Sequence, residues 1–238
     1  MDSSLTGRIA EVQRRIDAAC ERSGRKPEDV NVIAVTKYVS LATAVQAFDE
    51  GLRHLGENRF QDALPKWEAI SGETAEGGDG QAIWHFIGSL QTNKVKDVIG
   101  KFTYIHSLDR LSLAQAIEKR AAQLGVQVPC MIQVNVSGED SKHGLEPEQL
   151  PELLEAIKSF QYVQPVGLMT MAPYEAEAEQ TRPVFRALRE LRDKMNATVA
   201  LNAPLTELSM GMSNDFEVAI EEGATWVRLG TILVGKEG

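Results

Sequence analysis

The segment Val32-Ile33-Ala34-Val35-Thr36-Lys37 is the first of a series of short apolar segments that alternate with helix-period segments along the chain. Its β-branched residues predict a buried strand. Seven further strands are predicted at HLGEN (54–58), WHFIG (84–88), YIHSL (104–108), PCMIQVNV (129–136), PVGLMTM (165–171), ELSMGM (207–212) and WVRLG (226–230). Strands that alternate with helices indicate right-handed βαβ units and a parallel sheet.

Eight such units predict an α/β fold, a single (β/α)8 TIM barrel over residues 1–238, because a barrel of this kind needs about 250 residues. An extra N-terminal helix is predicted before the barrel. Its apolar residues fall on one helical face, and it should end near Gly24; these residues are Leu5, Ile9, Val12, Ile16 and Ala19. An open doubly wound sheet is less favoured, because no G-x-G-x-x-G follows the first strand.

Composition and charge exclude several classes of protein. The formal net charge of -9 argues against a nucleic-acid-binding surface, which needs a clustered excess of Lys and Arg. No apolar run reaches the roughly 18 residues of a membrane span, and the N-terminal segment lacks the apolar core of a signal peptide. We therefore expect a cytoplasmic protein without a membrane partner. Cys20 and Cys130 lack metal-ligand spacing and are expected to be reduced.

Reactive groups of a (β/α)8 barrel lie at the carboxyl ends of the strands. Candidate residues at the predicted strand ends are Lys37, Glu57, Asn58, His85, His106, Asn135, Met169, Ser209 to Ser213, and Arg228 to Gly230. A lysine that is partly buried at a barrel mouth can provide a neutral amine, which forms a Schiff base with a carbonyl compound. A solvated lysine at a strand end is the alternative for Lys37.

The loops after the seventh and eighth strands predict a phosphate site. Ser213-Asn214 leads into a helix with Glu217 in capping-box position, and Gly230-Thr231 opens a last short turn. Helix starts in these two loops commonly bind a phosphate in such barrels. Capping alone would also explain these residues. Since the first and eighth strands of a closed barrel are neighbours, Lys37 would face this site.

Arg228 lies within an apolar strand, where a guanidinium needs an acceptor. The acceptor is either a carboxylate, Glu57 or Asp215, or a ring nitrogen of a bound ligand. His85 and His106, on neighbouring strands, are expected to be packed or hydrogen-bonded. A metal site would need a third ligand, so no metal is predicted.

Several sequence blocks, in fixed order over nearly the whole chain, resemble the YggS/PROSC family of pyridoxal phosphate homeostasis proteins. The blocks are VTK (35–37), GEN (56–58), WHFIG (84–88), LQTNK (90–94), SKHGL (141–145), GLM (167–169), LSMGMS (208–213) and VRLGT (227–231). The resemblance implies a barrel similar to the N-terminal domain of bacterial alanine racemase that binds pyridoxal 5′-phosphate (PLP).

The resemblance also implies a role for each matching position. Lys37 corresponds to the lysine that holds PLP as an internal aldimine, and Arg228 to the partner of the pyridine nitrogen. Asn58 corresponds to a neighbour of the phenolic oxygen. The phosphate ligands correspond to Ser213, Gly230 and Thr231. PLP-accepting apoenzymes are the implied protein partners, and a monomer is expected.

Three functions follow from these expectations. The preferred one is a PLP-binding protein in vitamin B6 and amino-acid homeostasis, without a catalytic residue. An arginine at the pyridine nitrogen leaves that nitrogen unprotonated and weakens carbanion stabilisation. The second is a slow amino-acid racemase, although the racemase's second domain is expected to be absent, since only eight residues follow Gly230. The third is a lysine aldolase acting on phosphosugars. Lys142 is another amine able to capture an aldehyde.

Overall fold

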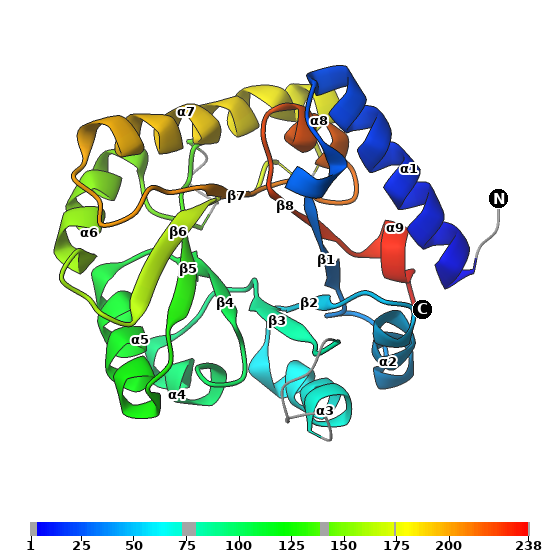
Figure 1. Ribbon diagram of the computed structural model, residues 1–238, viewed down its shortest axis with the longest axis horizontal. Helices are drawn as coiled ribbons and strands as arrows, with labels where there is room; N and C mark the ends of the chain where they lie inside the picture. The colour runs from blue at the N-terminus through cyan, green and yellow to red at the C-terminus, as the bar shows by residue number, and fades with distance from the viewer. Residues whose placement is uncertain (1–3, 73–79, 139–142, 174, 238) are drawn as a thin grey trace.

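A closed barrel of eight parallel strands forms the centre of the molecule, and the strands follow one another around it in sequence order (Figure 1). The computed structural model describes residues 4–72, 80–138, 143–173 and 175–237. The strands are β1 (Asn31–Val35), β2 (His54–Glu57), β3 (Ile83–Phe86), β4 (Tyr104–Leu108), β5 (Val128–Gln133), β6 (Val163–Met169), β7 (Glu207–Ser209) and β8 (Trp226–Leu229). The predicted TIM barrel is confirmed, and β1 pairs with β8 to close it.

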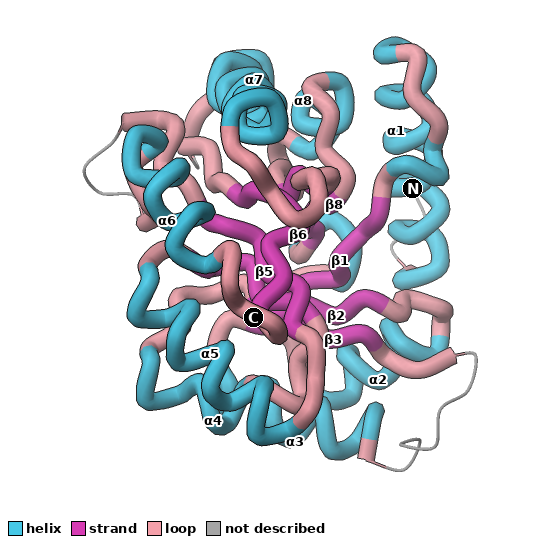
Figure 2. The backbone as a smooth tube through the Cα atoms, turned by 60° about the vertical axis from the view of Figure 1, so that its left-hand side comes forward, coloured by secondary structure: helices cyan, strands magenta, loops and turns pink. Residues whose placement is uncertain are grey.

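Helices form a layer outside the strands (Figure 2). They are α1 (Leu5–Ser23), α2 (Leu41–Asp49), α3 (Phe60–Ser71), α4 (Val95–Val98), α5 (Leu111–Leu124), α6 (Leu150–Ile157), α7 (Arg182–Thr198), α8 (Phe216–Glu221) and α9 (Thr231–Val234). No helix in the described part of the chain is long and apolar enough to cross a membrane.

Helix α1 is the predicted N-terminal helix. The Ser4 hydroxyl accepts a hydrogen bond from the Gly7 N–H (3.1 Å), which caps the first turn. Gly24 ends the helix in the left-handed region with φ of 68°, a conformation that suits glycine. The helix packs outside the barrel beside α8 and α9 (Figure 1), and Arg15 forms an ion pair with Glu217 of α8 (2.7 Å).

The predicted strands extend too far at several carboxyl ends. β1 ends at Val35 and not at Lys37, and β7 ends at Ser209 and not at Met212. At β1 the Thr36 N–H still donates to the β2 carbonyl of Gly56 (3.1 Å), but the Val39 N–H donates back to the Thr36 carbonyl (3.1 Å). The backbone therefore turns directly after Thr36, and Lys37 lies in the first loop.

Alternation along β1 decides which side chains face the barrel axis. Ile33 and Val35 pack with Met131, Met169 and Trp226 inside the barrel. Ala34 instead belongs to the larger apolar core that includes the surrounding helices. Because successive strand side chains point to opposite faces, Ile33 and Val35 face the barrel axis and Ala34 faces the helices.

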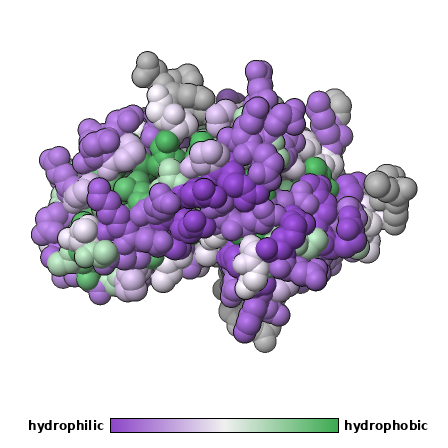
Figure 3. All heavy atoms as spheres, turned by 90° about the horizontal axis from the view of Figure 1, so that it is seen from above, coloured by the Kyte–Doolittle hydropathy of each residue, from purple (hydrophilic) through white to green (hydrophobic). Residues whose placement is uncertain are grey.

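The outer surface carries many ion pairs. The face with α7, α8 and α1 is mostly hydrophilic (Figure 3). Arg182 of α7 pairs with Glu221 of α8 (2.6 Å), and Arg186 pairs with Glu222 (3.0 Å). Cys20 and Cys130 are both free and buried, which agrees with the expected reduced thiols.

Candidate functional site

A cavity of about 330 Å³ lies at the carboxyl ends of the strands. Its lining comes from the loops after β1, β2, β3, β5, β6, β7 and β8, together with residues of the strands themselves. All of the predicted site residues line it, namely Lys37, Asn58, Ser213, Arg228, Gly230 and Thr231. The fold therefore places Lys37, from the first part of the sequence, beside residues near its end, such as Thr231.

Lys37 is half-buried at the edge of this cavity. Its Nζ lies 4.7 Å from the ring centroid of Tyr38, whose side chain is 76% exposed. The amine thus borders both the cavity and the surface, so a small carbonyl compound entering from solvent would meet it directly.

A buried ion pair holds the backbone immediately before Lys37. Lys66 Nζ donates to Glu57 Oε1 (2.8 Å) and to the carbonyl of Thr36 (2.6 Å). The Thr36 hydroxyl also donates to Glu57 Oε1 (2.6 Å), and all three residues are buried. The pair links α3 to the ends of β1 and β2. Glu57 is therefore the partner of Lys66, and the alternative of a Glu57–Arg228 pair is wrong.

Arg228 forms a buried part of the cavity lining and is 4% exposed. Its guanidinium donates to Ser209 Oγ (2.7 Å) and to the Thr170 carbonyl (2.9 Å). Burial lowers the pKa of Arg228 to about 10, while the charge of Asp215 acts in the opposite direction. Arg228 therefore stays a cation at neutral pH and places a positive charge beside the cavity.

Ser213 and Gly230 lie in the loops after β7 and β8, and Thr231 opens α9, as predicted, but the predicted capping box is wrong. Helix α8 begins after Asp215, whose Oδ1 accepts a hydrogen bond from the Met212 N–H (2.7 Å). This contact closes the turn at Asp215, one residue later than expected. Glu217 instead faces Arg15 of α1. Ser213 is left half-buried in the cavity wall.

Asn58 is half-buried and packs closely against Gly88. A Cβ added at Gly88 would lie 2.4 Å from the Asn58 carbonyl oxygen, so only glycine leaves Asn58 in its place. Gln133, His143 and Met171 also line the cavity and were not predicted as site residues, although His143 belongs to a motif that was recognised. Lys142 lies outside the described residues.

His85 and His106 lie in the barrel interior, where His85 Nδ1 is 2.9 Å from His106 Nε2. The expectation that they are hydrogen-bonded is confirmed. Within the described ranges, no group of three or more His, Cys, Asp or Glu side chains is placed to hold a metal ion.

Comparison with known proteins shows which family this chain belongs to. The family model "Alanine racemase, N-terminal domain" matches residues 8–237. The pyridoxal phosphate homeostasis protein of Aquifex aeolicus (strain VF5) is 47% identical over 229 residues, which are 96% of this chain and 96% of that protein. This chain belongs to the pyridoxal phosphate homeostasis protein family. The family member from Escherichia coli (strain K12) is 33% identical over 234 residues, 98% of this chain and 97% of that one.

Solved structures include proteins with a similar fold. PipY of Synechococcus elongatus PCC7942, with PLP bound, has a TM-score of 0.82 and is 35% identical, covering 98% of this chain and 100% of that chain. An alanine racemase of Clostridium difficile 630 in complex with cycloserine has a TM-score of 0.67 at 16% identity, covering 93% of this chain and 58% of that chain. The second comparison shows that the two proteins share the barrel fold.

Proposed function

We propose that this protein binds pyridoxal 5′-phosphate in the cavity, holds it through a Schiff base on Lys37, and serves PLP and amino-acid homeostasis. The observation that carries the proposal is that an amine, a buried guanidinium and the hydroxyls of two loops line one cavity. PLP carries an aldehyde, a ring nitrogen and a phosphate, and these chemical groups match that set. The PLP-bound structure of the relative PipY supports the same assignment.

The residues present suit each part of the cofactor. The Lys37 amine would form a C=N bond with the aldehyde carbon, with loss of water. Ser213, Gly230 and Thr231 would bind the phosphate with hydroxyl and backbone N–H donors. Asn58 would lie near the phenolic oxygen. The cavity, at about 330 Å³, falls within the range of small-ligand sites, which is about 300–1,000 Å³.

Arg228 favours binding of the cofactor without catalytic turnover. When bound, PLP supplies a ring that withdraws electrons from an attached amino acid, most strongly when its nitrogen is protonated. An arginine has only donors, so Arg228 would donate to the ring nitrogen and leave it unprotonated. Weak catalysis is therefore expected. PLP-accepting apoenzymes are the expected partners of a cytoplasmic monomer.

Absorption spectroscopy tests the proposal. Purified protein mixed with PLP should develop a Schiff-base absorption band, and Lys37→Ala should abolish it with the fold intact by circular dichroism. Lys96→Ala, which removes an exposed lysine of α4, is the matched control and should keep the band. No band in the wild type would refute PLP binding through an amine. A band that survives in Lys37→Ala would place the adduct on another lysine, such as Lys142.

Two enzyme alternatives have their own tests. Tyr38 and His143 are exposed side chains of the cavity lining that could exchange protons with an amino acid. Incubation with L-alanine in deuterated water should give little exchange, and substantial exchange with inversion at the α-carbon would favour a racemase. Cleavage of a phosphosugar in the absence of PLP would favour the lysine aldolase.

A further inference from the structure

A chain of hydrogen bonds runs through the barrel interior and ends at Arg228. The Arg228 guanidinium donates to Ser209 Oγ (2.7 Å), and Ser209 Oγ lies 2.8 Å from His106 Nδ1. His106 Nε2 is 2.9 Å from His85 Nδ1, and His85 Nε2 is 3.0 Å from His54 Nδ1. The chain crosses the barrel from β8 and β7 to β4, β3 and β2. Ser209, His106 and His85 are fully buried.

Arg228 sets the donor-to-acceptor direction of the hydrogen-bond chain. A guanidinium has donors and no acceptor, so Ser209 Oγ must accept from it. The Ser209 hydroxyl hydrogen then needs an acceptor in the buried interior, and within the described residues that acceptor is His106 Nδ1. The opposite direction, with a proton on His106 Nδ1, would leave the Ser209 hydroxyl without an acceptor.

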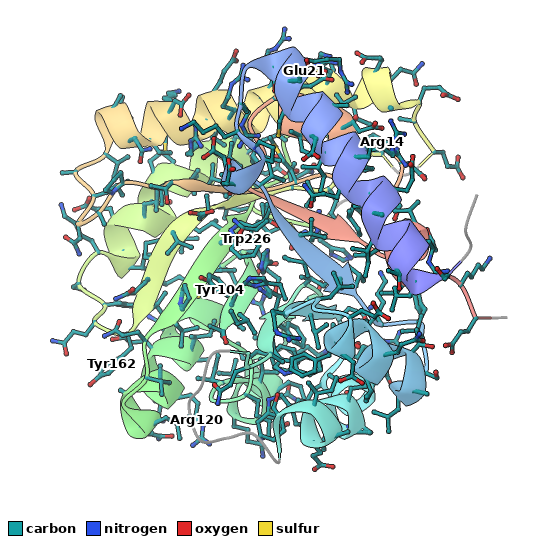
Figure 4. The ribbon with its side chains drawn as sticks, turned by 45° about the vertical axis from the view of Figure 1, so that its right-hand side comes forward. Arg14, Glu21, Tyr104, Arg120, Tyr162 and Trp226 are labelled. Atoms are coloured by element: carbon teal, nitrogen blue, oxygen red, sulfur yellow. The ribbon has the colours of Figure 1, made fainter. Side chains whose placement is uncertain are left out.

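The same direction continues through the other histidines. Because His106 Nδ1 accepts, its Nε2–H donates to His85 Nδ1, and His85 Nε2–H donates to His54 Nδ1. Packing fixes the rings: His85 is stacked on Tyr104 with centroids 4.7 Å apart, and His54 meets the edge of Trp226 at 5.0 Å. Tyr104 and Trp226 lie together inside the barrel (Figure 4).

The two buried histidines of the hydrogen-bond chain, His106 and His85, are neutral. Burial lowers the pKa of His106 well below its ordinary range, and the Arg228 cation lowers it further. Burial, with His106 and His54 nearby, has the same effect on the pKa of His85. A neutral histidine keeps one donor and one acceptor nitrogen, which the directional chain requires. His54 is the first residue of β2, at the barrel end opposite the cavity.

We propose that Ser209, His106 and His85 are positioning residues that hold the Arg228 guanidinium in a fixed orientation toward the cofactor ring. Ser209 Oγ and the Thr170 carbonyl occupy two guanidinium nitrogens. His106 keeps the Ser209 lone pairs directed at Arg228, because it takes the hydroxyl hydrogen. This inference rests on the proposed PLP site, but the hydrogen-bond chain exists in the protein without a ligand.

Nuclear magnetic resonance of 15N-histidine-labelled protein without PLP tests the chain itself. We expect neutral His106 and His85 near pH 7, each with its proton on Nε2, with signals assigned from the His106→Asn and His85→Asn variants. A proton on His106 Nδ1, or a charged His106, would overturn the proposed direction. This readout does not depend on whether PLP binds.

Binding measurements test the effect on Arg228. His106→Asn places an amide oxygen where Nδ1 lies and keeps an acceptor for Ser209, whereas His106→Leu removes it. The probe is pyridoxine 5′-phosphate, which has the ring nitrogen and phosphate but no aldehyde, so Lys37 cannot capture it. We expect His106→Leu to bind it roughly fivefold more weakly, and His106→Asn to stay within about twofold of the wild type.

Further readouts separate positioning from a structural role. His106→Leu should also shift the pH midpoint of the Schiff-base band, and affinity for inorganic phosphate should not change. Ser209→Ala removes the acceptor of Arg228 directly and should reproduce both effects if His106→Leu does not fold. Wild-type affinity and an unchanged midpoint in a folded His106→Leu or Ser209→Ala would overturn the proposal. If wild-type protein binds neither PLP nor pyridoxine 5′-phosphate, the proposed function fails instead.

Discussion

Replacing Lys66 with methionine tests whether the buried ion pair holds the loop that carries Lys37. The Lys66 and Glu57 side chains are 7% and 0% exposed, and Lys66 Nζ contacts both Glu57 Oε1 and the Thr36 carbonyl. Among the residues that the structure describes, none hydrogen-bonds to Glu57 Oε2, so removing Nζ leaves a buried carboxylate with only the Thr36 hydroxyl. Methionine has a similar length and keeps the apolar packing.

The expected loss of stability is large. Removing one partner of a buried ion pair costs about 3–5 kcal/mol, because the other charge stays buried and unpaired. For a domain of this size, each kcal/mol lowers the melting temperature by about 2–4 °C, so Lys66→Met should melt roughly 6–20 °C below the wild type. Lys158→Met is the control, since Lys158 and Glu155 form an exposed pair at 3.7 Å. That change should cost at most about 1 kcal/mol.

Thermal unfolding followed by circular dichroism measures both variants, and the Schiff-base band measures the consequence for Lys37. Lys66→Met should also capture PLP more weakly below its melting temperature, because the Thr36 carbonyl next to Lys37 loses one of its two donors and keeps only the Val39 N–H. Adding Glu57→Gln should restore most of the stability, since an amide needs no countercharge. Equal melting temperatures for Lys66→Met and Lys158→Met would refute the reasoning.

Three further predictions concern other parts of the molecule. Gly88→Ala should displace Asn58, because the added Cβ would lie 2.4 Å from its carbonyl oxygen, and crystallography together with a weaker PLP band would check this. Ser213→Ala should weaken PLP binding roughly 10- to 100-fold through the loss of one hydrogen bond to a charged phosphate, as measured by fluorescence titration. Burial raises the pKa of Glu222, but hydrogen bonds from Arg186 and Arg182 lower it by more, so its stabilising contribution exists at neutral pH and is lost as pH falls through the lowered value. Glu222→Gln should therefore melt below the wild type near pH 7, with a difference that closes as the pH falls below the ordinary glutamate pKa of about 4.3; a difference that stays constant as the pH falls would contradict the assignment.

The position of the site could be predicted from the sequence because strand periodicity and barrel topology act together. Eight apolar segments predict a closed barrel, and closure places Lys37 beside the loops that hold Ser213 and Gly230. Neither the prediction of the barrel nor the placement of Lys37 depends on the residue at which each strand ends. The predicted end of β1 was too late because the Val39 N–H donates back to the Thr36 carbonyl and turns the backbone there. At β7, Met210 and Gly211 still form backbone hydrogen bonds with β8, but Gly211 has a φ of 95°, which takes the backbone out of the strand conformation. Apolar periodicity reports neither of these features.

Side-chain contacts between residues that are far apart in the sequence could not be predicted in the same way. Lys66 lies in a helix and has no local pattern that marks it as buried, yet it pairs with Glu57 at the end of β2. His54 begins a predicted strand, but its contact with His85 depends on both side chains facing inward and on the β2–β3 register, which pairs His54 with Ile83 and His85 with Gly56. Arg228 illustrates the limit best. The sequence indicates that a guanidinium in an apolar strand needs an acceptor, whereas its partner Ser209 is fixed only by the barrel register.

The cavity has a buried end and an open end, and this difference bears on the proposed function. Arg228 is 4% exposed and is held by two hydrogen bonds on the protein side. Thr231, in contrast, is exposed, and Lys37 and Ser213 are half-buried. A ligand at the proposed site would therefore meet a buried, hydrogen-bonded group at its ring, while its phosphate and aldehyde would lie where water and other molecules have access. An enzyme gains from excluding water around the reacting atoms. A protein that accepts a cofactor and later releases it needs water and an incoming amine to reach the C=N bond, and the exposure around Lys37 meets that need.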